Sequence, residues 1–118
     1  MKYLMKYESI NGEPQVGDYV ICNEVSASKT SIKFTSENIG QIVGITKSSN
    51  HPYIIRYDKV SNQTLKKEFH QTIWNFCSAD QFGIYGKNCT VMRKDEIKYF
   101  SHSREDVELF MNIEKYNL

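Results

Sequence analysis

Three short stretches decide the fold of this chain: Gly17-Asp18-Tyr19-Val20-Ile21-Cys22, Ile39-Gly40-Gln41-Ile42-Val43-Gly44-Ile45 and Tyr53-Ile54-Ile55-Arg56-Tyr57. Each is rich in β-branched or aromatic residues and lies next to turn-forming residues, which is the pattern of a strand. In the third stretch alternate side chains face opposite sides of a sheet, Tyr53, Ile55 and Tyr57 on one side and Ile54 and Arg56 on the other. The polar turn at residues 47–52 predicts that the second and third strands form a hairpin.

The remaining segments outside the helices are predicted from their turn-forming residues and glycines. Residues 26–36 are rich in Ser and Thr and show little period, so we expect a long surface loop there. Gly40 and Gly44 lie inside the second strand and indicate a sharp bend or a close backbone approach. Residues 81–88 contain two glycines and are expected as a loop, after which residues 89–92 and 96–100 return to extended structure.

The segment from about residue 62 to residue 77 fits two patterns. Its large apolar residues recur at spacings of four, four and three, the period of one helix face, at Leu65, Phe69, Ile73 and Phe76. A strand over residues 68–74 is the alternative, because β-branched and aromatic residues are frequent there. We expect the helix.

A second helix is expected over about residues 103–116. Ser103 is followed three positions later by Asp106, a spacing similar to that of a capping box. Val107, Phe110 and Met111 then follow at i, i+3 and i+4, so their side chains share one face of an amphipathic helix.

The order of these segments resembles that of a small SH3-like barrel. The resemblance is carried by G-D-x-V at residues 17–20, a long loop, I-G-x-I-V-x-I at 39–45 and Y-I-I-x-Y at 53–57, and Val91-Met92-Arg93-Lys94-Asp95-Glu96-Ile97 resembles a closing strand. The chain looks like the small barrel proteins that phages and large DNA viruses encode, and no specific family is indicated. The resemblance implies a binding module more than a particular chemistry.

The expected fold class is therefore mainly β (α+β), with all 118 residues in one domain. Barrel strands are expected over about 14–60 and 88–100, an insertion that contains the helix over about 62–87, and the C-terminal helix over about 103–116.

Composition narrows the class of protein. The chain has 15 Lys and Arg against 14 Asp and Glu, and this balance argues against a protein that coats nucleic acid or acidic membranes by bulk charge. No apolar run is long enough to cross a membrane, and no export signal is apparent. The odd number of cysteines, three, then fits reduced thiols in the cytoplasm. Lys, Ile, Asn and Tyr make up 41 residues, a bias towards A/T-rich codons that is common in phages and large DNA viruses and also in many bacteria.

Catalytic and metal-binding patterns are weak. There is no glycine-flanked nucleophile, and no spacing brings Cys77 or Cys89 next to His70 or His102 as a base. The spacings among His70, Cys77 and Cys89 are unlike those of structural zinc sites. We expect neither an enzyme nor a metal site nor a bound cofactor.

Interleaved cationic and aromatic residues are the most informative candidate site. Bases stack on aromatic rings, and phosphates are held by the guanidinium fork of arginine. The anion contacts expected on this basis are Arg56, Arg93 and Arg104, with Lys94 in support, and the expected stacking surfaces are Trp74 and Tyr99. The alternative is that the rings belong to the core and the cations to an ordinary solvated surface.

The expected function is a non-enzymatic binding protein, of phage or viral origin. It would sequester a small anionic, nucleotide-like ligand or block a host protein, as a counter to host defence, in the host cytoplasm. Because so short a chain has little interior volume, we expect a homo-oligomer whose subunits share the pocket through the C-terminal helix or the inserted segment. The alternative is an SH3-like adaptor that binds nucleic acid or a ribonucleoprotein, and an enzyme acting on a phosphorylated metabolite is the third hypothesis.

Overall fold

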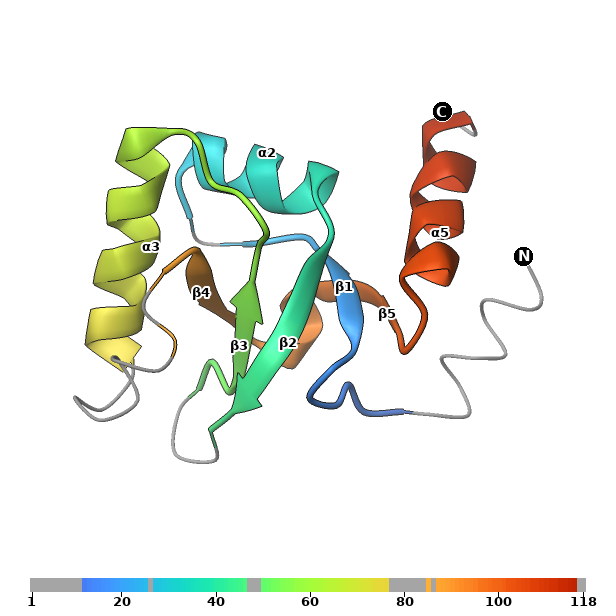
Figure 1. The fold of residues 1–118 in the computed structure, drawn as a ribbon, viewed down its shortest axis with the longest axis horizontal. Coiled ribbons are helices and arrows are strands. Elements are labelled where there is room, and N and C mark those ends of the chain that lie inside the picture. The colour runs from blue at the N-terminus through green and yellow to red at the C-terminus, as the bar shows by residue number, and fades with distance from the viewer. Residues whose placement is uncertain (1–11, 26, 47–49, 77–84, 86, 117–118) are drawn as a thin grey trace.

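A five-stranded antiparallel sheet forms the centre of the computed structural model, which describes residues 12–25, 27–46, 50–76, 85 and 87–116 (Figure 1). The strand order is β4-β3-β2-β1-β5, with strands β1 (Tyr19–Cys22), β2 (Gly40–Ile45), β3 (Tyr53–Arg56), β4 (Cys89–Met92) and β5 (Ile97–Ser101). Within the described residues, three α-helices and one 3-10 helix accompany it: α2 (Lys29–Glu37), α3 (Gln63–Phe76), η1 (Lys94–Glu96) and α5 (Arg104–Tyr116). The α+β class and the predicted hairpin of β2 and β3 are confirmed.

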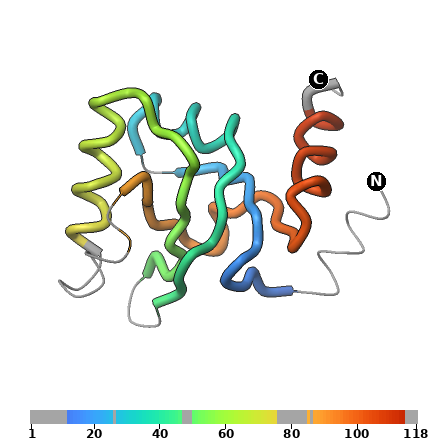
Figure 2. Tube along the Cα trace, viewed as in Figure 1, coloured from blue at the N-terminus to red at the C-terminus, as the bar shows by residue number. Residues whose placement is uncertain are grey.

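The two edges of the sheet are joined by a very short connection. Strands β4 and β5 lie at opposite edges, yet only residues 93–96 separate them in sequence (Figure 2). Five flat strands at about 4.8 Å spacing would put the edge strands about 19 Å apart, more than a turn containing a 3-10 helix conveniently spans. The sheet is therefore curled, but within the described residues no pairing joins β4 to β5, so it is not closed.

The segment over residues 91–97, which resembles a closing strand in sequence, is interrupted by η1. The side chain of Glu96 causes this break, because its carboxylate accepts hydrogen bonds from the backbone N–H groups of Arg93 (2.9 Å) and Val25 (3.1 Å). Glu96 is 5% exposed. Its carboxylate oxygens take the place of the backbone carbonyl groups that a neighbouring strand would have offered to the N–H groups of Arg93 and Val25.

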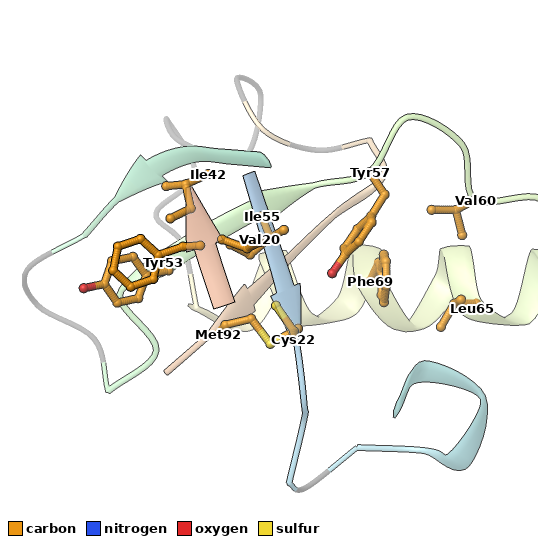
Figure 3. Packing of buried hydrophobic residues seen from close by; sticks show 11 residues of the cluster. Val20, Cys22, Ile42, Tyr53, Ile55, Tyr57, Val60, Leu65, Phe69 and Met92 are labelled. Carbon is orange, nitrogen blue, oxygen red and sulfur yellow. The ribbon is translucent and has the colours of Figure 1, made fainter. Parts of the chain in front are cut away.

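The main core lies on one face of the sheet (Figure 3). As predicted, Tyr53, Ile55 and Tyr57 share that face, where Leu65 and Phe69 of α3 pack against them. Two smaller clusters cover the other face. One joins Ile21 and Tyr99 to Val107 of α5, and the second joins Ile54, Cys89 and Val91 to Ile73 of α3. Figure 1 shows the result, with α3 beside β4 and α5 beside β1 and β5.

Both predicted helices are confirmed. Helix α3 buries Leu65, Phe69 and Ile73, so the alternative strand over residues 68–74 is wrong. Helix α5 places Val107, Phe110 and Met111 against the sheet as expected. The Oγ atom of Ser103 lies 3.4 Å from the backbone nitrogen of Asp106, and the Asp106 carboxylate accepts a hydrogen bond from the hydroxyl of Ser101.

The predicted loop over residues 26–36 is wrong, because most of it is helix α2. Ser28 caps this helix by accepting a hydrogen bond from the N–H of Ser31, 3.1 Å away. The hydroxyls of Ser31 and Thr35 donate to the carboxylate of Glu24, and Phe34 packs on the main core. Ser and Thr disfavour an isolated helix, but Glu24, outside the helix, accepts hydrogen bonds from the two buried hydroxyls of α2, those of Ser31 and Thr35.

The close backbone approach predicted at the glycines of β2 is confirmed. A Cβ atom on Gly40 would lie 2.4 Å from Cγ2 of Ile55, and one on Gly44 would lie 2.4 Å from the hydroxyl of Tyr85. The pairing of β2 with β3 also shifts register between Ile42 and Gly44. Both glycines therefore let neighbouring side chains reach the backbone.

Replacing Gly40 with Ala should destabilise the protein by about 1–3 kcal/mol, because Ile55 and Tyr57 are buried and cannot move aside freely. Urea denaturation measures the loss. Ile45→Ala, at a half-exposed position of the same strand, is the control and should cost less. Equal stability of Gly40→Ala and the wild type would contradict the packing described for this face.

Candidate functional site

The six residues expected to bind the ligand do not form one site. Arg56 ends β3, and Arg104 begins α5. Arg93 and Lys94 lie at η1, Trp74 is on α3, and Tyr99 is in β5. Cys89 pairs with Arg56 while Arg93 follows the far end of the same strand, so Arg56 and Arg93 are separated by about 13 Å of strand.

Tyr99 does not provide a stacking surface for a ligand. Its side chain is fully buried, and its ring stacks on Phe110 of α5 with the ring centres 4.5 Å apart. The expected stacking role is not supported, because the packing of α5 on the sheet uses this ring.

Arg93 and Lys94 already have acidic partners. Nε of Arg93 lies 3.1 Å from a carboxylate oxygen of Asp95 and 3.8 Å from one of Glu96, and Lys94 forms an ion pair with Glu13. Their positive charge is therefore balanced locally by carboxylates.

Arg93 also lines a groove of about 790 Å³ between α3, β4 and the start of α2. Three carboxylates line the same groove, those of Glu24, Glu68 and Glu96, together with the cationic side chain of Lys67 and with His51. Negative charge matches or exceeds positive charge, so the groove does not favour an anion.

Glu24 connects α2 to this groove. Its Oε1 atom accepts hydrogen bonds from Ser31 (2.7 Å) and Thr35 (3.0 Å). Burial raises the pKa of Glu24 above its ordinary value, the two hydroxyls oppose the rise, and the carboxylates of Glu96 and Glu68 add to it. Sequence reasoning missed this network because it placed residues 26–36 in a loop.

The raised pKa of Glu24 predicts a pH dependence of stability. The folded protein binds the Glu24 proton more tightly than the unfolded chain does. The contribution of this proton binding to the free energy of unfolding is therefore fully present below the unfolded pKa, and it is lost as pH rises through the folded pKa. In Glu24→Gln the amide oxygen still accepts from Ser31 and Thr35 but does not titrate. The variant should therefore gain stability relative to the wild type between about pH 4 and 7.

Urea denaturation of both proteins across that pH range measures the effect. Glu37→Gln, at an exposed position in helix α2, is the control. A difference between wild type and Glu24→Gln that does not change with pH would show that Glu24 does not titrate as described.

Arg56 lies in a row of side chains that crosses the sheet. Its register partner is Gln41 of β2, whose own partner is Tyr19 of β1. Directly paired residues project from the same face, so Arg56 and Tyr19 lie on one face, about 10 Å apart across two strand spacings. Arg56 is exposed, and within the described part of the chain no carboxylate forms an ion pair with it.

Arg104 meets the other end of this row. Its Cζ atom lies 5.8 Å from the centre of the Tyr19 ring, and its Nη1 lies 3.5 Å from a carboxylate oxygen of Asp58, two residues after Arg56. Its Nε also lies 3.3 Å from Glu108. Asp58 and Glu108 are both more than half exposed, so these pairs hold Arg104 only weakly. We call the group Arg56, Gln41, Tyr19 and Arg104 the arginine row.

Trp74 lies apart from the arginine row, on the outer side of α3. Its side chain is 59% exposed. Lys66, Lys67 and His70 are exposed on the same helix. The sequence contained the signal for this grouping, because residues 66, 70 and 74 have the four-residue spacing of one helix stripe.

The cysteines and the remaining side chains add no metal centre to the described part of the chain. Cys22 and Cys89 are fully buried, and burial raises the pKa of the Cys22 thiol to about 12. Within the described residues no group of three or more His, Cys, Asp or Glu side chains is placed to hold a metal ion. Cys77 lies outside those residues.

None of the helices in the described ranges combines the length and the apolar character that a membrane span requires.

Comparisons with known proteins give no relative to argue from: no family model, no curated protein and no solved structure matches the chain. The side chains and their geometry are therefore the basis for a functional assignment.

Proposed function

We propose that this protein is a non-enzymatic binding protein, and that the arginine row holds the phosphate or another anionic group of a small, nucleotide-like ligand. The observation that carries the proposal is the register of β1, β2 and β3, which brings Arg56 onto the same face as Tyr19 and thereby towards Arg104. Two of the three arginines of the chain then face one surface.

The ion-pair partners of the two arginines support this choice of site. Arg56 lacks a carboxylate partner among the described residues, and the partners of Arg104 are solvent-exposed and replaceable by a phosphate. A guanidinium group binds phosphate through two parallel hydrogen bonds. The Tyr19 ring is covered by Arg104, so the guanidinium plane of Arg56 is the surface on which a base would stack.

The arginine row is also suited to a pocket shared between subunits. On its face of the sheet, Tyr19 packs against the cluster under α5, whereas neither that cluster nor the cluster under α3 includes Arg56. A second copy would enclose a ligand there, and this supports the proposed homo-oligomer. We also propose the SH3-like arrangement, which the order β4-β3-β2-β1-β5 and the curled sheet support. The counter-defence role and the host-protein target stay predictions.

Substituting the arginines tests the site. Arg56→Ala should weaken binding of a nucleotide by roughly 10- to 150-fold, the effect of losing a hydrogen-bonded contact to a charged group of about 1.5–3 kcal/mol. Arg104→Ala should act in the same direction. Isothermal titration calorimetry against a panel of nucleoside mono-, di- and cyclic phosphates measures the affinities.

Arg93→Ala is the matched control, because Arg93 has carboxylate neighbours in a groove with balanced charge. It should bind the same nucleotides as well as the wild type. Loss of binding in Arg93→Ala with normal binding in Arg56→Ala would move the site to the groove, and normal binding in all three variants would overturn the assignment.

A further inference from the structure

The outer side of α3 carries a second surface with its own chemistry. Lys66, Lys67, His70 and Trp74 are all exposed, and at 100° per residue they fall within about 100° of arc on the helix. We call these four residues the basic-aromatic face. From Lys66 to Trp74 it extends about 12 Å along the helix at 1.5 Å per residue.

Helix α3 itself carries a single carboxylate, and Lys67, at one border of the face, also lines the groove that contains Glu24, Glu68 and Glu96. Glu68 is its only acidic residue, and the carboxylate of Glu68 accepts a hydrogen bond from the hydroxyl of Ser28 at 2.7 Å, which turns it towards α2. The helix also has no acidic residue in its first turn. The basic-aromatic face therefore complements a polyanion, although the whole chain has a formal net charge of only +1.

The exposed ring of Trp74 indicates which class of polyanion fits this face, namely nucleic acids with unpaired bases. Trp74 is 59% exposed, whereas the apolar residues on the inner side of α3, Leu65, Phe69 and Ile73, are at most 2% exposed. A broad exposed ring next to lysines binds nucleic acids whose bases are unpaired, because any base can stack on it while the lysines contact the backbone. In duplex DNA or RNA the base faces are covered by their neighbours.

We propose that the basic-aromatic face binds short segments of single-stranded nucleic acid without sequence preference. Trp74 stacks on one base, and Lys66 and Lys67 contact the neighbouring phosphates. The arginine row takes no part, so this proposal and the proposed function stand or fail separately.

The fluorescence of Trp74, the single tryptophan of the chain, tests the proposal directly. Titration with a single-stranded thymidine oligonucleotide should give saturable quenching at low salt. With two phosphate contacts the slope of log K against log salt should be about −1.4, so binding should weaken about sevenfold between about 50 and 200 mM salt. Inorganic polyphosphate, which has charge but no bases, should not quench.

The affinities of variants for a labelled oligonucleotide, measured by fluorescence anisotropy, complete the test. Trp74→Ala should bind about tenfold more weakly, and Trp74→Phe should restore most of the affinity because it keeps a ring. The double variant Lys66→Ala/Lys67→Ala should lose most of the salt dependence. Lys98→Ala is the control: Lys98 lies on β5, forms an ion pair with Glu114, and should have no effect.

Three results would overturn the proposal: no quenching by the oligonucleotide, equal binding by wild type and Trp74→Ala, or equal weakening by Lys98→Ala and the α3 lysine variant. Because these side chains are exposed, the substitutions should leave the fold intact, and circular dichroism of each variant checks this.

Discussion

Pairing of strand β1 along both of its edges is the constraint on which the rest of the structure depends. Tyr19 and Val20 pair with β2 on one side, and all four residues of β1 pair with β5 on the other. Val20 and Cys22 enter the main core, and Ile21 enters the cluster under α5. Without β1 the two halves of the sheet would have no common strand, and α5 would lose the surface it packs on. The arginine row has the same origin, because Tyr19 is the residue of β1 that links Gln41 to Arg104.

Elements whose hydrophobic pattern is complete within a few residues could be predicted from the sequence. The strands around Val20, Ile42 and Ile55 and the helix over α3 are of this kind, since each shows its period locally. Helix α2 could not be predicted in this way. The hydroxyls of Ser31 and Thr35 donate to Glu24, which precedes the helix, and the hydroxyl of the capping residue Ser28 donates to Glu68, 40 residues further along the chain. The break at η1 likewise depends on a contact of Glu96 with Val25, 71 residues away.

The candidate site shows the same division between local and distant information. Sequence reasoning selected all three arginines by type, but whether an arginine is available to a ligand depends on its partners in space. Lys94 is paired with Glu13, 81 residues away in sequence, and Arg93 with the carboxylates of its own turn. Tyr99 was indistinguishable in sequence from an exposed aromatic residue, and its burial follows from α5. In contrast, the grouping of Lys66, His70 and Trp74 follows from helix spacing alone once α3 is recognised.

Native mass spectrometry tests the central claim, that the sheet presents a binding site for a small anion, most directly. The protein is purified without denaturation, incubated with the small-molecule fraction of a cell extract, and measured intact before bound material is released and identified. We expect an oligomer that carries a discrete, nucleotide-sized anion in a fixed ratio to the subunits. A bare protein in the presence of the whole extract, with no anion retained at any subunit ratio, would contradict the claim.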